Sequence, residues 1–242
     1  TGSGKTTTLY SCLQELNTSD VNIITCEDPV EYQIAGLNQV QINSIVGLTF
    51  SAALREVMRQ SPDIILVGET RDSETADIAI KAALTGHLVL STLHTNDAAG
   101  AITRLIDMGI EPSLLAASLI LAQAQRLCSR LCSCKKPLQE PPLKTMETYH
   151  IDPKRFEGVT LYGPGAGCPK CHNTGYKGRI ALMEVLSVNR ELRQDIIKGT
   201  PIKEISAKAK ARGMVTLKEV GLRKVKDGLT SMDAALEETG GE

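Results

Sequence analysis

TGSGKT (residues 1–6) decides the fold of this chain, because it matches the last six positions of the Walker A pattern G-x-x-x-x-G-K-[S/T]. Gly2 and Gly4 allow backbone conformations that other residues avoid. The amides that they turn inward form, with the N-terminus of the helix that follows, a cradle for phosphate oxygens. Lys5 is expected to reach the β- and γ-phosphates and Thr6 to bind Mg²⁺. The predicted nucleotide-binding residues of this segment are Thr1, Gly2, Ser3, Gly4, Lys5, Thr6 and Thr7.

The alternative to a nucleotide loop is a glycine-rich turn with a chance lysine, but a helical pattern follows directly over residues 7–16. The first glycine of the motif and the strand before it are not in the sequence, so we expect a fragment of a larger domain. Because such a strand is central to a buried sheet, we also expect low activity from the fragment alone.

Length and composition exclude several classes of protein. A chain of 242 residues with 42% apolar content can form one large domain, or one domain with a small appendage. Aromatic stacking platforms are nearly absent, with no Trp and two Phe, and the net charge is −1, so we expect no nucleic-acid partner. The sequence has no secretory signal and no apolar run near the roughly 20 residues of a membrane span. We therefore expect a soluble, cytoplasmic protein.

The first half alternates strand and helix patterns, which is typical of a parallel sheet with helices on its faces. Near-continuous apolar runs predict buried strands at residues 21–26, 63–68 and 87–93. Apolar residues at helical spacing predict helices at 49–60, at 73–84 and from Pro112 to about Leu131. The candidate N-caps are Thr49 or Ser51 for the first helix and Ser73 for the second.

The composition changes after residue 131. Residues 132–179 hold two cysteine clusters, several glycines and six prolines, which predicts a loop-rich insert that needs an external cross-link such as a metal ion. A short strand is expected at 180–186, followed by helices with candidate N-caps at Ser187 or Asn189, Thr200, Thr216 and Ser231. We therefore predict a core over 1–131, a cysteine-rich, zinc-binding insert over 132–179 and a helical subdomain over 180–242.

Glu69 ends the apolar run IILVG and is the candidate general base. Hydrolysis at a phosphate loop needs a carboxylate that orients or deprotonates the attacking water, and a buried strand beside the loop commonly supplies it. The Asp that usually precedes this Glu in a Walker B motif is Gly68 here, so a further Mg²⁺ ligand must come from elsewhere. A surface Glu after a core strand is the alternative.

An acidic cluster, Glu27-Asp28-Pro29-Val30-Glu31, follows the first predicted strand. Carboxylates in this position project at the carboxyl edge of the sheet, where ligands bind. Glu27, Asp28 and Glu31 are therefore candidates to bind Mg²⁺ directly or through water, although a solvated turn is the alternative.

Two histidines flank the third predicted strand. His94, at its carboxyl end, is placed to donate a hydrogen bond to a γ-phosphate oxygen, whereas His87 precedes the strand and fits this role less well. A core or loop histidine with ordinary partners is the alternative for both.

Four of the seven cysteines are paired in sequence. Cys132 and Cys134 form C-x-C, and Cys168 and Cys171 form C-x-x-C. In a cytoplasmic protein such spacing indicates a metal site, and four thiolates predict one closed, structural zinc site. Because C-x-C is unusual, Cys128 is a candidate substitute ligand.

The combination of motifs resembles the carboxyl-terminal ATPase domain of the type II secretion and type IV pilus assembly ATPases, over nearly the whole chain. TGSGKTTTLY is similar to that family's Walker A, TCEDPVEY to its Asp box, DIILVGETRD to its atypical Walker B and TGHLVLSTLHTN to its His box. The cysteine insert and GYKGRIALMEVL resemble the zinc-bearing segment of the secretion and pilus-extension branch, which pilus-retraction ATPases lack.

The resemblance implies an α/β fold, with a RecA-like P-loop NTPase core truncated at its start, a zinc-binding insert and a carboxyl-terminal helical subdomain. It also implies a homohexamer that binds ATP and Mg²⁺ at the cytoplasmic face of a bacterial inner membrane. There it would act on a polytopic platform protein and other assembly proteins. Arginines of a preceding domain complete the site in relatives, and Arg71 and Arg104 are local candidates, with surface ion pairs as the alternative.

Three functions remain to be weighed. An ATP-hydrolysing motor for pilus assembly is favoured, with the equivalent motor of type II secretion next, because the segment GMVTLKEVGLRKV is slightly more similar to the pilus branch. A nucleotide-binding scaffold without turnover would be expected if Lys5 or Glu69 were replaced, and both are present. A zinc-containing DNA translocase would need a basic stripe, and Lys208, Lys210 and Arg212 are more simply a solvated helix face.

Overall fold

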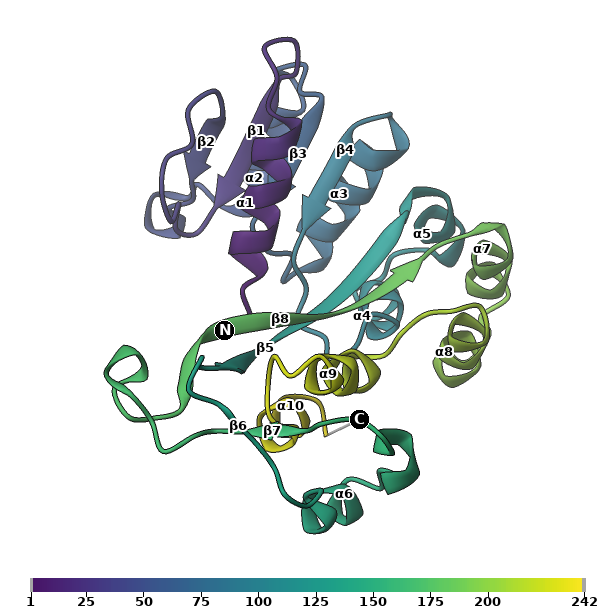
Figure 1. The fold of residues 1–242 in the computed structure, drawn as a ribbon. Helices are drawn as coiled ribbons and strands as arrows, with labels where there is room; N and C mark the ends of the chain where they lie inside the picture. Colours follow the sequence, from purple (N-terminus) through teal and green to yellow (C-terminus); the bar gives the residue numbers. More distant parts are fainter. Residues whose placement is uncertain (1, 241–242) are drawn as a thin grey trace. The chain divides into compact units, whose positions relative to one another are not determined.

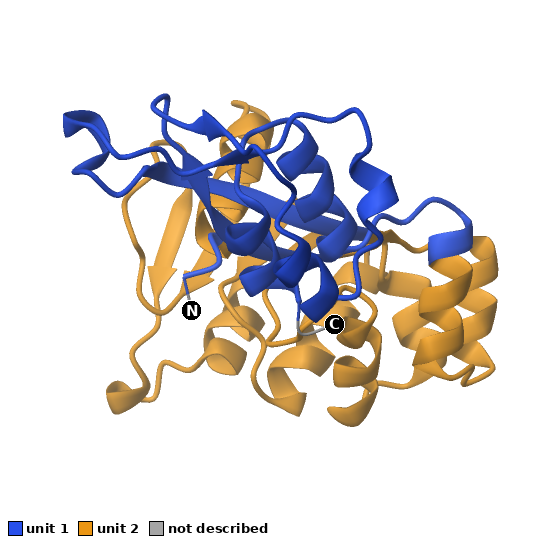
Figure 2. Ribbon diagram, turned by 60° about the horizontal axis from the view of Figure 1, so that its bottom comes forward, with its two compact units in different colours: residues 1–4, 123–185, 210–242 blue, residues 5–122, 186–209 orange. Residues whose placement is uncertain are grey.

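The computed structural model describes residues 2–240 and divides them into two compact units, each discontinuous in sequence (Figure 2). One unit, called here the sheet unit, comprises residues 5–122 and 186–209. The other, called the ribbon unit, comprises residues 1–4, 123–185 and 210–242. The three predicted domains stay a prediction, and the compact units divide the chain differently. Within residues 2–240, no helix has both the length and the apolar character that crossing a membrane requires.

The sheet unit contains a four-stranded parallel sheet in the order β2-β1-β3-β4, which confirms the predicted α/β class (Figure 1). The central strands have every residue buried, as near-continuous apolar runs predict. The strands are β1 (Ile23–Glu27), β2 (Asn38–Gln41), β3 (Ile64–Val67) and β4 (Leu88–Ser91).

Helices cover both faces of this sheet. On one face, Ile24 and Ile65 pack with buried residues of α2 and α3; on the other, Ile23 and Ile64 pack with Leu13 of α1. Thr49 caps α2 as predicted, but Asp72, not Ser73, caps α3 by accepting a hydrogen bond from the Thr75 amide. The bounds are α1 (Lys5–Leu16), α2 (Phe50–Val57), α3 (Ser73–Leu84) and a short 3₁₀ turn, η1 (Ser44–Val46).

Of the remaining helices of the sheet unit, two follow β4 in the sequence and two follow β8. α5 packs against α3 and α7, and Lys208 of α8 pairs with the buried Asp195 of α7 at 2.8 Å. Asn189, one of the two predicted caps, accepts a hydrogen bond from the Leu192 amide. The helices are α4 (Gly100–Asp107), α5 (Pro112–Ser118), α7 (Arg190–Ile197) and α8 (Ile202–Ala211).

The predicted helix from Pro112 to Leu131 was wrong in its second half. After α5, the chain forms the long strand β5 (Leu121–Leu131), which pairs with β8 (Tyr176–Ser187). The amides of Cys132 and Val188 donate to the carbonyls of Gly175 and Ile120, so the two strands run antiparallel. LAQAQRL has strong helix formers, but burial of alternate alanines and pairing with β8 outweigh that local preference.

The ribbon unit consists of most of β5 and β8 with a small core beside them. That core packs α9 against α10 and joins them to α6 and the 3₁₀ turn η2 through apolar side chains that include Met146, Phe156 and Leu236. Thr216 and Ser231 cap α9 and α10 as predicted. The other elements are β6 (Lys136–Pro137), α6 (Leu143–Thr148), η2 (Pro153–Phe156), β7 (Tyr162–Gly163), η3 (Pro169–Cys171), α9 (Leu217–Lys226) and α10 (Met232–Thr239).

Candidate functional site

The phosphate loop has the backbone conformation that its glycines predict. Gly2 and Gly4 have φ angles of +86° and +82°, in the left-handed region that other side chains rarely adopt. α1 begins at Lys5, so its first amides and its dipole follow the loop directly. Lys5 and Thr6 are half-buried and Thr7 is exposed, whereas Thr1 lies outside the described residues.

Three predicted site residues meet at the carboxyl edge of the sheet unit. The Glu69 side chain, 13% exposed, follows β3 and accepts a hydrogen bond from the Arg71 guanidinium at 2.6 Å. Its other carboxylate oxygen lies 3.3 Å from Nε2 of His94, which follows β4. The hydrogen bond and the charge of Glu69, with a smaller effect of Asp28, raise the pKa of Arg71. The Glu69 carboxylate therefore lies between the Arg71 guanidinium and the His94 imidazole.

Hydroxyl groups tie the ends of β3 and β4 together and so position this cluster. Thr92 Oγ1 donates to the Gly68 carbonyl at 2.8 Å, and the Thr70 amide donates to the Thr92 carbonyl at 2.9 Å. The Thr70 and Ser91 hydroxyls are also 2.8 Å apart. These residues could not be predicted from the sequence, because their only local signal is a set of small polar residues after an apolar strand.

Gly68 occupies the position at which a Walker B motif has Asp, and it packs against the backbone of β1. A Cβ atom at this position would lie 3.2 Å from the Cys26 carbonyl oxygen and 3.4 Å from the Glu27 Cα. The Gly68 amide donates to that same carbonyl at 2.8 Å. Any side chain at position 68 therefore requires the backbone of β1 to give by a few tenths of an ångström.

Glu27 is buried, with 3% exposure, and all of its recorded partners are neutral donors. One carboxylate oxygen accepts from Tyr10 of α1, and the other accepts from Thr25 at 2.6 Å and from Gln39 at 3.2 Å. Burial, together with the hydrogen bond and charge of Glu27, raises the pKa of Tyr10 to about 12. Asp28 and Glu31 follow on an exposed turn, and the Asp28–Pro29 peptide is cis.

The two remaining candidates of the sheet unit are His87 and Arg104. His87 donates from Nδ1 to the Ala82 carbonyl at 2.9 Å, at the C-terminal end of α3. Arg104 is exposed in the last turn of α4. The preference for His94 over His87 as a phosphate donor stays a prediction.

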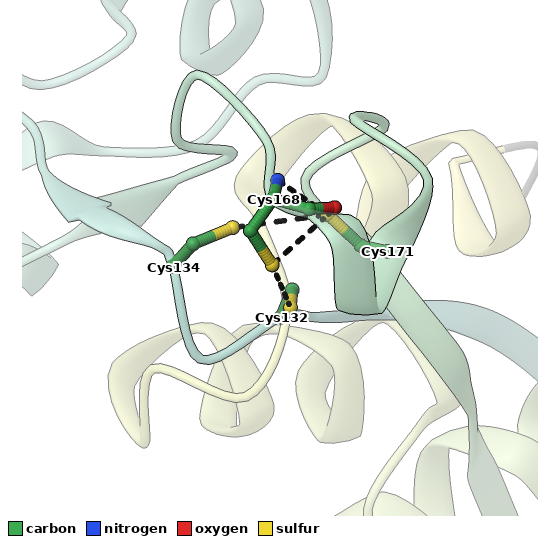
Figure 3. A group of neighbouring side chains, drawn as sticks. All are labelled: Cys132, Cys134, Cys168 and Cys171. Carbon is green, nitrogen blue, oxygen red and sulfur yellow. Dashed lines mark hydrogen bonds between the residues drawn. The ribbon is translucent and has the colours of Figure 1, made fainter.

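In the ribbon unit, the four paired cysteines converge into one group, with all sulfur atoms within 4.8 Å of one another (Figure 3). Three of the sulfur–sulfur distances are 3.7, 3.8 and 3.7 Å, for the pairs 132–168, 134–171 and 168–171. Tetrahedral zinc with Zn–S bonds of about 2.3 Å requires sulfur atoms about 3.8 Å apart. Cys132, Cys134, Cys168 and Cys171 thus fit one zinc ion, whereas Cys128 is buried elsewhere, with its thiol near Thr230 Oγ1.

The backbone around Cys171 is shaped to stabilise a thiolate. The amides of Cys168 and Gly175 lie 3.2 and 3.3 Å from its sulfur. Burial acts to raise the pKa of Cys171, but hydrogen bonds from these amides and from the thiols of Cys168 and Cys134 outweigh it and lower the pKa to about 6. The segment is so compact that a Cβ atom on Gly165 would lie 2.0 Å from the Cys134 carbonyl oxygen. Deprotonated thiolates in a closed loop are what a structural zinc site needs.

The chain resembles known proteins over nearly its full length. The family model described as "Type II/IV secretion system protein" matches residues 1–238. The chain is 50% identical over 240 residues to the type IV pilus assembly ATPase PilB of Myxococcus xanthus, covering 99% of this chain and 42% of that protein. It is 48% identical over 240 residues to the type II secretion system protein E of Pectobacterium carotovorum, covering 99% and 47%.

A solved structure shares the fold over almost the full chain. The pilus retraction motor PilT, solved with bound ADP, superposes with a TM-score of 0.70 at 28% identity, covering 98% of this chain and 58% of that one. The chain thus spans less than half of the two curated relatives named above, which contain further sequence. On the match of the family model and the identity to these relatives, the chain belongs to the type II/IV secretion system protein family.

Proposed function

We propose that this chain is the ATP-hydrolysing part of a motor that powers type IV pilus assembly. The observation that carries the proposal is the meeting of Glu69, Arg71 and His94 at the carboxyl edge of the sheet unit. Similarity to the pilus assembly ATPase of Myxococcus xanthus supplies the biological context.

In the proposed reaction, Glu69 orients the attacking water and accepts its proton. Its low exposure and its two polar partners keep the carboxylate in one orientation. When Arg71 and His94 turn toward the γ-phosphate, they leave the carboxylate free for water and donate to the phosphate oxygens. Lys5 and the amides of residues 2–4 would hold the β- and γ-phosphates.

Mg²⁺ would neutralise charge on the phosphates, with Thr6 as its predicted protein ligand. Asp28 and Glu31 are exposed and stay candidates to hold water around the ion. Glu27 is a weaker candidate, because three neutral donors already engage its carboxylate. For the cysteine cluster we propose one structural Zn²⁺ held by four thiolates.

The proposed assembly is a homohexamer at the cytoplasmic face of a bacterial inner membrane. Its partners would be a platform protein and other proteins of the apparatus, and membrane contact would run only through them. Type II secretion is the second candidate function, because the identity to the secretion protein of Pectobacterium carotovorum is 48%, close to that of the pilus relative. A nucleotide-binding scaffold without turnover is the remote alternative.

The test is Mg-ATP hydrolysis by the natural full-length protein, measured over a range of protein concentrations. Glu69→Gln should abolish turnover and leave ATP binding intact, whereas Glu237→Gln, on an exposed face of α10, should change neither. Turnover that rises more than linearly with concentration supports an assembled motor. Undiminished turnover in Glu69→Gln would reject Glu69 as the base, and ATP binding without turnover would favour the scaffold.

A further inference from the structure

A buried glutamine of β5 donates a hydrogen bond to the backbone of the phosphate loop. Gln125 Nε2 donates a hydrogen bond to the backbone carbonyl of Ser3 at 2.9 Å, although the two residues are 122 positions apart in sequence. Both residues belong to the ribbon unit, and Gln125 is 6% exposed. The contact is therefore a specific, buried polar contact to the loop.

The Ser3 carbonyl, which can only accept, sets the orientation of the Gln125 amide, and a second glutamine supports that orientation. Gln123 Nε2 donates to Gln125 Oε1 at 3.0 Å, which leaves the Gln125 nitrogen facing Ser3. An amide flip would place two oxygen atoms against each other at Ser3 and two NH₂ groups against each other at Gln123. The pair of glutamines thus presents a donor to the loop in one orientation.

Gly4 packs directly against this amide. A Cβ atom on Gly4 would lie 2.9 Å from Gln125 Nε2 and 3.2 Å from Leu127 Cδ1. A side chain at position 4 would have to displace the Gln125 amide, and the φ of +82° favours glycine independently. The loop and β5 are shaped to fit each other.

A phosphate loop works by pointing backbone amides at the ligand, so its carbonyls must point away and find other partners. We propose that Gln125 is a positioning residue for nucleotide binding: by fixing the Ser3 carbonyl, it holds the neighbouring amides toward the phosphates. The proposal rests on the proposed function, because it concerns the same nucleotide site.

The experiment compares Gln125→Glu and Gln125→Met with the parent in the natural full-length protein. Gln125→Glu keeps the shape but replaces the donor with an acceptor, and Gln125→Met removes both polar atoms. Gln194→Glu, on an exposed face of α7, is the matched control for added charge. The measurements are the Kd for ADP and for Mg-ATP, the KM and kcat for hydrolysis, the Tm and the zinc content.

Both Gln125 variants should bind ADP and Mg-ATP about tenfold more weakly, which corresponds to the loss of one buried hydrogen bond. KM should rise by a similar factor while kcat changes less than about threefold, because the loop holds the phosphates before and during the reaction. The Tm of Gln125→Met should stay near the parent value, whereas Gln125→Glu should have a lower Tm because it buries a carboxylate against a carbonyl. The zinc content of both should stay near that of the parent, and Gln194→Glu should match the parent throughout.

Nucleotide affinity within about twofold of the parent in both variants would overturn the proposal. Weak binding that accompanies a large fall in Tm and loss of zinc in both would overturn it equally, because Gln125 would then be a folding residue only. A parent protein that binds ATP but does not hydrolyse it contradicts the proposed function and still allows the binding test of Gln125.

Discussion

Tyr10→Phe should destabilise the sheet unit measurably, because it removes the hydroxyl group that donates a hydrogen bond to the buried carboxylate of Glu27. Tyr10 has no exposed surface and donates to Glu27, which is 3% exposed. Hydrogen bonds to charged groups contribute about 1.5–3 kcal/mol. The amide of Glu31 also loses its acceptor, at 3.3 Å, but it lies on an exposed residue that water can reach. We expect a loss of about 2 kcal/mol in the free energy of unfolding, or roughly 4–8 °C in Tm for a chain of this size.

The effect should depend on pH in a defined direction. The pKa of Tyr10 is raised from its ordinary value near 10 to about 12. The folded protein therefore keeps the phenol neutral up to a higher pH than the unfolded chain does. The stabilisation is therefore complete below pH 10 and is lost as the pH rises from about 10 to 12. The difference in stability between parent and Tyr10→Phe should be full at pH 8 and should narrow above pH 10.

Urea denaturation followed by circular dichroism, at pH 8 and at pH 10.5, measures this difference. Tyr32→Phe is the matched control: its ring packs edge-to-face on Tyr10 at 4.8 Å, and its side chain is largely exposed. That control should change stability by less than about 0.5 kcal/mol. A Tyr10→Phe protein as stable as the parent at pH 8 would refute the argument that this hydrogen bond anchors α1.

Three further predictions concern separate sites. Cys134→Ser should abolish the binding of one zinc per chain, measured by metal analysis, whereas Cys128→Ser should retain it; the opposite pattern would reject the proposed ligand set. Gly68→Ala should cost about 1–3 kcal/mol in urea denaturation, because its Cβ would lie 3.2 Å from the Cys26 carbonyl oxygen, and an unchanged midpoint would contradict that close approach. Arg71→Ala should reduce ATP hydrolysis at least tenfold while changing stability by less than about 1 kcal/mol, because its side chain is 67% exposed, and full activity would remove it from the site.

Patterns that are local in sequence predicted the sheet unit well. Continuous apolar runs identified three of its strands, and β2, which is half-exposed, was missed because its sequence NQVQ lacks an apolar run. Caps were predictable at Thr49 and Ser231, where a polar residue precedes an apolar helical pattern. β5 was not, because its residues favour a helix locally and only its distant partner β8 makes it a strand.

Some residues of the candidate site were also predictable from the sequence, and others were not. The strand patterns predicted Glu69 and His94, the family resemblance suggested Arg71 as a candidate, and parallel strands explain why these residues meet. Spacing also predicted the four cysteines, although it left Cys128 open as a ligand. Thr70, Thr92 and Gln125 had no signal, because a hydroxyl or amide partner for a backbone carbonyl can come from any part of the chain.

Two acids, Glu27 and Glu69, end neighbouring strands of one sheet, and their partners suggest different roles. Glu27 is held by neutral donors inside the core, none of which a phosphate would attract. Glu69 is held by Arg71 and lies next to His94, and both of these side chains can donate hydrogen bonds to phosphate oxygens. A carboxylate that loses its partners when the ligand arrives becomes free to act on water at that moment. We infer that Glu69 is the reactive acid and that Glu27, through Tyr10, anchors the helix that carries Lys5.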